Sequence, residues 1–92
     1  MPNKSFSLLK QCRVCGYEFD DLYPWGVDGK TPSFEICDCC GTEFGHDDAT
    51  LLAIKQKRAK WIEGGALWAR PQVRPSHWSV ETALAKIPHE YL

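Results

Sequence analysis

A single phrase, written twice, constrains this chain more than any other feature of its sequence. The first copy, CRVCGYEFDD, runs from Cys12 to Asp21, and the second, CDCCGTEFGHDD, runs from Cys37 to Asp48. Both contain two cysteines separated by two residues and followed by glycine, and both continue to a Glu-Phe pair. Glycine in this position lets the backbone turn through positive φ and points its N–H groups at the sulfur atoms. The chain is therefore expected to make the same cysteine-bearing turn, a knuckle, at two places.

The two knuckles predict one metal site with four cysteine ligands. Cys12 and Cys15 form the first pair and Cys37 and Cys40 the second, with 21 residues between the pairs. This spacing is typical of zinc ribbons, in which four thiolates close a tetrahedron. Thiolates are soft ligands that select zinc or iron over magnesium or calcium. We expect one structural Zn²⁺, with iron as the alternative that the ligands alone do not exclude.

Cys39, the fifth cysteine, is predicted not to bind the metal. It lies inside the second knuckle, and pairing it with Cys37 would remove the correspondence with the first knuckle. His46 follows Cys40 by six residues and is the other side chain near the site that offers a ligand atom. An odd number of cysteines also disfavours a secreted framework of disulfides.

The length and the N-terminus bound the kind of protein that this chain can be. A chain of 92 residues buries a small core and commonly needs a metal or a disulfide for stability. No apolar run approaches the ~20 residues of a membrane-spanning helix. The N-terminal MPNKSFSLLKQC lacks the apolar core of a secretory signal. We therefore expect a cytoplasmic protein without a membrane partner, in a compartment that keeps thiols reduced.

Two helices are expected after the knuckles. The segment DDATLLAIKQKRAKWIEGG has Asp47 or Asp48 as its N-cap and a Gly-Gly pair as its stop. The later VETALAKI is capped by Ser79 and ended by Pro88. Around the knuckles, YEF and SFEI alternate apolar and polar residues as half-buried strands do.

Two known families share parts of this pattern. CRVCGYEFD and CDCCG are similar to the knuckles of rubredoxins, which bind iron and carry single electrons, although Arg13 and Asp38 stand where rubredoxin knuckles usually have proline. A longer part of the chain resembles the small bacterial cysteine-rich proteins of the CPCC family, through CRVCGY, PSFEICDCCG, HDD, WIEGG and PSHW. This resemblance implies a zinc-ribbon-like fold, and some small bacterial proteins of this kind resemble immunity proteins that inhibit a toxin.

These features predict one domain, 1–92, of the α+β class. We expect a small zinc-ribbon or rubredoxin-like β-hairpin module over 8–46 and a helical half over 47–92, with two helices packed on the module. A chain of this length normally makes a single domain.

Charge divides the chain into an acidic and a basic half. Between Glu18 and Asp48 nine acids and one base sum to −8, whereas six bases and one acid between Ala49 and Trp78 sum to +5. A concentrated acidic surface attracts cationic partners and speeds their association. We therefore expect a protein-interaction module whose partner has a basic surface, as an immunity-type inhibitor of a basic toxin would require. The candidate contact residues are Asp20, Asp21, Asp28, Asp47 and Asp48.

A nucleic-acid-binding zinc ribbon is the second interpretation, and iron-based electron transfer is the third. Basic and aromatic side chains together are typical of surfaces that bind single strands. The isoelectric point near 6.3 is low for such a domain, and bases late in a helix already complement its dipole. No enzyme is expected, because four cysteines leave zinc no open position. The residues of the nucleic-acid interpretation are Lys55, Lys57, Arg58, Lys60, Arg70 and Arg74, with Trp61 and Trp68.

Overall fold

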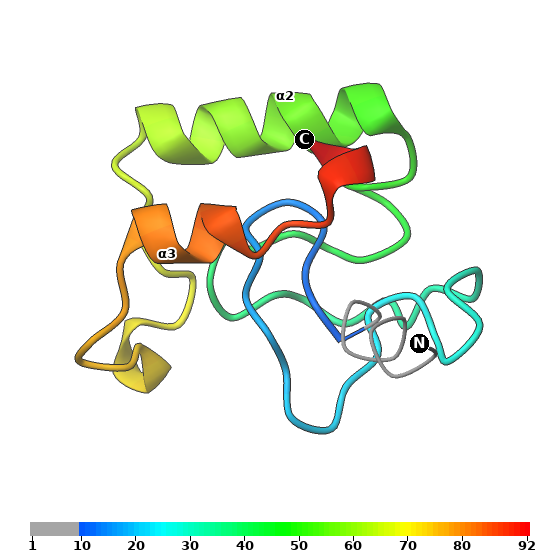
Figure 1. Cartoon of the computed structure of the whole chain (residues 1–92), viewed down its shortest axis with the longest axis horizontal. Coiled ribbons are helices and arrows are strands. Elements are labelled where there is room, and N and C mark those ends of the chain that lie inside the picture. The colour runs from blue at the N-terminus through cyan, green and yellow to red at the C-terminus, as the bar shows by residue number, and fades with distance from the viewer. Residues whose placement is uncertain (1–9) are drawn as a thin grey trace.

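The computed structural model describes residues 10–92. Its regular elements are helix α2 at Leu51–Glu63 and helix α3 at Val80–Ala85, with 3₁₀ turns η1 at Pro71–Val73 and η2 at His89–Tyr91. Figure 1 shows α2 and α3 along one side of the molecule, and the irregular chain that precedes α2 extends to the other side. The end of the chain returns to α2, which it contacts through η2.

The prediction of an α+β fold with a β-hairpin module is wrong. The part of the chain that the structure describes contains no β-strand and no sheet, and each knuckle leaves only one isolated antiparallel bridge. These bridges join Gln11 to Glu18 and Ile36 to Glu43. Before the second knuckle the ladder cannot grow, because Phe34 has φ +62° and a strand needs extended backbone with negative φ. The alternation in YEF and SFEI therefore reflects packing around two turns, and the fold consists of two helices on an irregular, knuckle-based half.

Helix α2 begins after Thr50, and neither Asp47 nor Asp48 is its N-cap. The Thr50 side chain accepts a hydrogen bond from Ala53 N at 3.0 Å and so satisfies an N–H group of the first turn. Both aspartates instead accept hydrogen bonds from the backbone of the second knuckle region. The cap prediction failed because a threonine closer to the helix offers the same oxygen chemistry.

The predicted stop of α2 and the predicted N-cap of α3 are confirmed, whereas α3 ends at Ala85 and does not reach Ile87 as predicted. Gly65 has φ +101° and closes α2, and the N–H of the next residue donates to Trp61 O at 2.8 Å. Ser79 caps α3 by accepting from Thr82 N at 3.2 Å. None of the helices between residues 10 and 92 combines the length and the hydrophobicity that a membrane span requires.

Helix α3 packs on the first knuckle. Gly16 has φ +83°, and a Cβ on this residue would collide with the carbonyl oxygen of Ala83 in α3 and would lie 3.1 Å from Ile87 Cγ1. The backbone of α3 therefore approaches the knuckle more closely than any side chain would permit. Among the described elements, η2 has the backbone that lies close to α2, whereas α3 rests on the first knuckle.

The buried core joins both knuckles to α2 and to the segment that follows it. The cysteines and Val14 are buried together with Ile54 and Trp61 of α2 and with Trp68. Indole rings meet edge to face, as between Trp68 and Trp78, whose centroids are 5.3 Å apart. The cysteine cluster thus lies at the centre of the packing, where its surroundings are apolar.

Candidate metal centre

The structure brings the four predicted cysteines into one buried cluster. The Sγ atoms of Cys12, Cys15, Cys37 and Cys40 all lie within 4.8 Å of one another. Cys12 Sγ is 3.7 Å from Cys40 Sγ, and Cys15 Sγ is 3.7 Å from Cys37 Sγ, so each close pair joins the two knuckles. Sulfur atoms at the corners of a tetrahedron with metal–sulfur bonds of about 2.3 Å are about 3.8 Å apart. The cluster therefore has the size and the donor chemistry of a four-coordinate site for a soft metal ion.

Both knuckles are built by the same hydrogen bonds, with a constant offset in numbering that makes Cys12 correspond to Cys37. Cys12 N donates to Tyr17 O at 2.9 Å in the first knuckle, and Cys37 N donates to Thr42 O at 2.8 Å in the second. The glycine after each second cysteine donates to the carbonyl of the first cysteine, at 2.9 and 3.0 Å. These glycines have φ of +83° and +78°, as the repeated phrase predicts.

Cys39 occupies the position that corresponds to Val14, between the two cysteines of its knuckle. Both side chains are fully buried, and Cys39 is not part of the sulfur cluster. A buried free cysteine behaves as a small hydrophobic residue. The side chain of His46 is also outside the cluster, and its Nδ1 lies 3.1 Å from Asp47 Oδ1 at the surface.

Burial controls the charge of the sulfur atoms. It raises the pKa of the Cys12 and Cys15 thiols well above their usual range, because a buried thiolate loses its hydration. Hydrogen bonds, the largest from Cys12, hold the pKa of Cys40 well below that range. Four thiolates together therefore require positive charge beside them, which a coordinated metal ion provides.

Two further groups make hydrogen bonds with the sulfur atoms. Val14 N lies 3.4 Å from Cys12 Sγ and donates to it. Thr42 Oγ1 lies 2.9 Å from Cys40 Sγ and is fully buried. Hydrogen bonds of this kind orient metal ligands and reduce their charge. The sequence analysis missed Thr42, although its place directly after the glycine of the second knuckle is the available signal.

Arg58 of α2 fastens the first knuckle to the end of the chain. Its Nε donates to Val14 O at 2.7 Å, and its Nη2 donates to Arg13 O at 2.9 Å and to Tyr91 O at 2.6 Å. Arg58 was predicted to be one of the bases of a nucleic-acid surface. Its spacing, four residues after the buried Ile54, places it on the inner face of α2 and is the signal for this structural role.

In the second knuckle, backbone groups bind the carbonyls that Arg58 binds in the first. The carbonyls that correspond to those bound by Arg58 belong to Asp38 and Cys39. They accept hydrogen bonds from Arg70 N at 2.9 Å and from Ala69 N at 3.0 Å. The same two positions of the knuckle are therefore satisfied by a side chain in one case and by the main chain in the other.

The five aspartates that we predicted to contact a partner lie in different surroundings. Asp20 and Asp21 are exposed. Asp28 is exposed too, but its carboxylate accepts three hydrogen bonds within its own loop, which lower the pKa of this group. Asp28 therefore has a local structural role in addition to any contact with a partner.

Asp47 and Asp48 stabilise the turn between the second knuckle and α2. Asp48 is fully buried and accepts from Trp25 Nε1 at 2.8 Å and from Gly45 N at 2.7 Å. Asp47 accepts from Glu43 N at 3.0 Å. A buried carboxylate cannot meet a partner surface, so Asp48 serves the fold.

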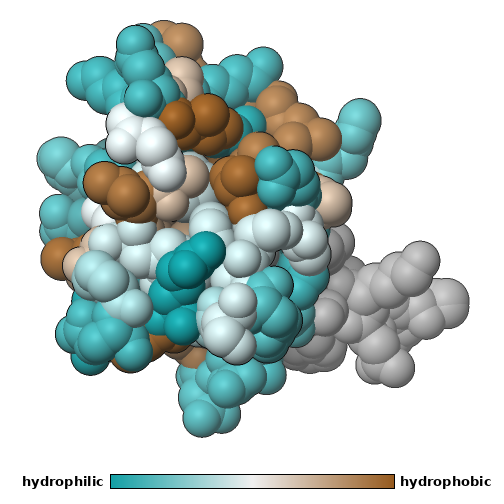
Figure 2. Space-filling view, turned by 90° about the vertical axis from the view of Figure 1, so that its left-hand side faces the viewer, coloured by the Kyte–Doolittle hydropathy of each residue, from teal (hydrophilic) through white to brown (hydrophobic). Residues whose placement is uncertain are grey.

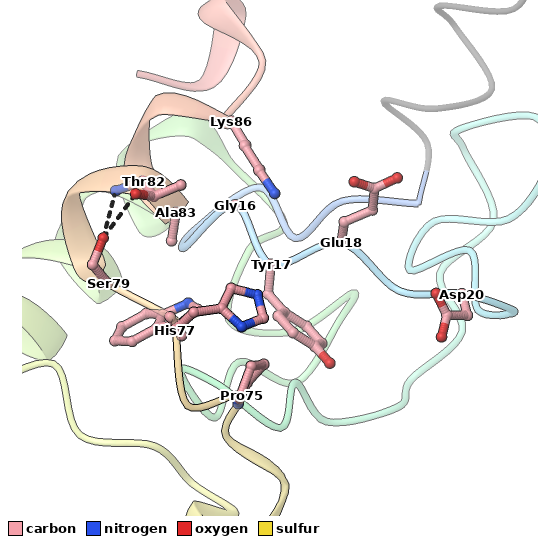
Figure 3. Close-up of a pocket in the computed structure, with 11 residues that line it drawn as sticks. Gly16, Tyr17, Glu18, Asp20, Pro75, His77, Ser79, Thr82, Ala83 and Lys86 are labelled. Atoms are coloured by element: carbon pink, nitrogen blue, oxygen red, sulfur yellow. Dashed lines mark hydrogen bonds between the residues drawn. The ribbon is translucent and has the colours of Figure 1, made fainter.

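A groove of about 330 Å³ opens beside the first knuckle. One wall carries Glu18 and Asp20, and the other carries His77 together with Lys86, which directly follows α3. Figure 3 shows the Lys86 side chain extending from the end of α3 toward the wall that bears Glu18. A partner that reaches Asp20 through this groove would therefore meet both signs of charge.

The aromatic residues of the nucleic-acid interpretation are not surface residues. Trp61 and Trp68 are buried, so their faces are not available for stacking on bases. Arg70 Nη1 lies 3.4 Å from Asp38 Oδ1, which pairs it with an acid. Figure 2 looks at the side where α2 ends, and it shows a hydrophilic surface interrupted by hydrophobic patches.

Comparison with known proteins gives one informative match. The chain is 30% identical over 78 residues to the uncharacterized protein YoaQ of Bacillus subtilis (strain 168), and the match covers 70% of this chain and 66% of that relative. The chain thus spans just under two thirds of the length of the curated relative that it matches. No family model and no solved structure matches the chain. The likeness to the CPCC family therefore stays a resemblance, and the function has to be argued from the site.

Proposed function

We propose that this chain is a zinc-stabilised protein-interaction module. The observation that carries the metal part is the cluster of four buried Sγ atoms, in which each close pair joins the two knuckles. Zn²⁺ supplies positive charge that holds four thiolates together at tetrahedral distances. With all four positions taken by cysteine, no site remains for water or substrate, so the role is structural and not enzymatic.

Zinc is expected to stabilise the whole chain, because both knuckles belong to one core with α2. Binding energy at a structural zinc site of this kind is folding energy, on the order of 10 kcal/mol. We expect one zinc per chain by elemental analysis, and we expect a strong chelator to collapse the dispersion of the NMR spectrum. Serine at Cys12, Cys15, Cys37 or Cys40 should abolish stoichiometric binding. An NMR spectrum that is unchanged after metal removal would contradict a structural role, and visible absorption from iron in protein purified from its host would favour electron transfer.

The proposed partner is a protein with a basic surface, and an immunity-type inhibitor of a basic toxin fits this description. Nine acids crowd the chain between Glu18 and Asp48, and they repel one another beside a sulfur cluster that is itself anionic when it holds Zn²⁺. Association with a cationic surface relieves this repulsion, and the attraction between opposite charges accelerates the association. Asp20 and Asp21 are the best candidates among the predicted contacts, because both are exposed and have no side-chain hydrogen bond within residues 10–92.

Charge reversal tests the partner proposal. Zinc-loaded protein is used to capture its partner from the native host, and the captured pair is then measured by calorimetry. Lysine at Asp20 and Asp21 should weaken binding by about tenfold or more, and added salt should do the same. The charge reversals Lys55→Glu and Lys57→Glu serve as the matched control and should leave the affinity unchanged. Binding of RNA or DNA that is lost with the Lys55 and Lys57 variants would support the nucleic-acid interpretation instead.

A further inference from the structure

At one pair of corresponding positions in the two knuckles, the polar residue is buried and the apolar residue is exposed. Gln11 and Ile36 precede the first cysteine of each knuckle and make the same bridge, to Glu18 and to Glu43. Gln11 is only 9% exposed and its Oε1 has no hydrogen-bond partner in the described chain, whereas Ile36 is 60% exposed. Folding alone would favour isoleucine at the buried position and glutamine at the exposed one.

The end of the chain covers the first knuckle and leaves the second open. Pro88 and Tyr91 line a small cavity together with Gln11, so the C-terminal segment lies over this side of the first knuckle. At the corresponding place on the second knuckle, no segment within residues 10–92 shields Ile36 to a similar degree. Ile36 is therefore exposed at a position whose counterpart in the first knuckle, Gln11, is covered by the C-terminal segment.

Phe34, two residues before Ile36, adds an exposed aromatic ring on a strained backbone. It is 63% exposed and has φ +62°, a region that bulky residues rarely adopt. Its ring lies against Gly45, where a Cβ would come within 2.9 Å of Phe34 Cε1. Backbone strain of this kind persists where the surrounding structure enforces it, and it is concentrated at functional sites. We call these two residues and their surroundings the Phe34–Ile36 surface.

Two exposed glutamates belong to the backbone segments that carry the Phe34–Ile36 surface. Glu35 lies between its two apolar residues in the sequence, and Glu43 is the bridge partner of Ile36. Both glutamates are exposed, and neither makes an ion pair with a residue in the described part of the chain. The surface therefore combines apolar side chains with uncompensated negative charge.

Exposure of an apolar residue does not by itself distinguish the Phe34–Ile36 surface, because Leu67 is exposed as well. It is 73% exposed, but it borders a cavity that is also lined by Lys57 and Lys60. Lysines surround Leu67, and it lies outside the two knuckles, so it has no counterpart in a repeated segment. It provides a matched control for the charge of the surface.

We propose that the Phe34–Ile36 surface is the docking site for a basic protein partner. An apolar side chain of the partner packs on Phe34 and Ile36, and its lysine or arginine residues lie opposite Glu35 and Glu43. An apolar centre with a charged rim is the usual anatomy of a protein interface, and a few central residues supply most of its affinity. This inference rests on the proposed protein-binding function and locates the apolar anchor that charge alone does not supply.

The test uses full-length, zinc-loaded, ¹⁵N-labelled protein and two synthetic peptides. One peptide has a central tryptophan flanked by lysines, and the other has glutamate in place of each lysine. The lysine peptide should shift the amide signals of Phe34, Ile36 and Glu43 and bind about tenfold or more tightly than the glutamate peptide. Ile36→Gln and Phe34→Gly should each weaken this binding severalfold, whereas Leu67→Gln should not.

The variants also separate binding from folding. Ile36→Gln restores the residue type that stands at the corresponding place in the first knuckle, so it should not lower the Tm of the zinc-loaded protein. Phe34→Gly should keep or raise the Tm, because glycine adopts φ +62° without strain. Equal binding of both peptides, no binding of either, or shifts centred on Leu67 would overturn the proposal. So would a dimer in sedimentation experiments that Ile36→Gln dissociates, because a second copy of the chain would then be the occupant.

The same variants distinguish this inference from the proposed function. If the lysine peptide, or the partner from the native host, binds in a manner that depends on Asp20 and Asp21 but not on Ile36, the basic partner is retained and the Phe34–Ile36 surface is rejected. If Ile36→Gln and charge reversal at Asp20 and Asp21 both weaken binding of the native partner, both proposals are supported.

Discussion

The two knuckles have the same backbone and different neighbours. Both turn through a glycine at positive φ and make the same bonds around their first cysteine. The first is enclosed: α3 lies on Gly16, Arg58 binds two of its carbonyls, and the C-terminal segment covers Gln11. The second is held by backbone bonds from residues 69 and 70, and it leaves Ile36 exposed. The four-cysteine cluster is thus made from two halves with the same backbone, and the rest of the protein contacts these halves differently.

This difference separates what a knuckle requires from what the tertiary structure adds. Both knuckles have two cysteines and a glycine, which the sequence repeats. In both, the backbone N–H of the first cysteine donates to the carbonyl of the residue after the glycine. The additions are contacts with other segments of the chain, and these contacts differ between the two knuckles. Substitutions at corresponding positions should therefore have unequal effects, and the three predictions that follow use this inequality.

The largest inequality is expected for the two glycines. Gly16→Ala combines positive φ with a collision against the Ala83 carbonyl, and it should destabilise the protein by about 3 to 5 kcal/mol. Gly41→Ala has the same strain of φ, but its nearest neighbour would be Ala69 Cβ at 3.6 Å, so it should cost about 1 to 2 kcal/mol. Chemical denaturation of the zinc-loaded variants measures both values. Equal losses would show that α3 does not rest on the first knuckle as described.

A smaller inequality is expected for the two arginines that lie beside the knuckles. Arg58→Met leaves three backbone carbonyls without their donor and should cost about 2 to 4 kcal/mol. Arg70→Met removes an exposed ion pair but keeps the backbone N–H that holds the second knuckle, so the cost should stay below about 1 kcal/mol. The measurement is again denaturation with zinc in excess. A large effect at Arg70 and a small one at Arg58 would contradict the assignment of these contacts.

The smallest effect is expected where the two knuckles differ by one buried side chain. Cys39→Val gives the second knuckle the residue that Val14 provides in the first, and it should change the free energy of unfolding by less than about 1 kcal/mol. The variant should still bind one zinc, as elemental analysis can determine. Loss of zinc from Cys39→Val, with retention in Cys40→Ser, would mean that Cys39 is a ligand.

The cluster of four cysteines was predictable because the features that form it are local. Each pair of cysteines and its glycine lie within five consecutive residues. A short stretch of sequence therefore specifies a whole knuckle, and the second copy of the stretch supplies the other pair of cysteines. The position of Cys39 outside the cluster followed from the correspondence with Val14. The glycine stop of α2 and the Ser79 cap of α3 were also correct, because caps depend on the few residues around a helix end.

Contacts between distant segments were not predictable from the sequence. Alternating residues in YEF and SFEI indicated strands, yet Phe34 takes positive φ and each hairpin is reduced to one bridge. The roles of Arg58, which reaches residues more than thirty positions away, and of the buried Asp48 depend on which segments meet. The sequence by itself determined a cluster of four cysteines and two helices, because those rest on short-range chemistry. Only the tertiary structure decided which knuckle is covered and which is open, because long-range packing places the C-terminal segment over one of two nearly identical turns.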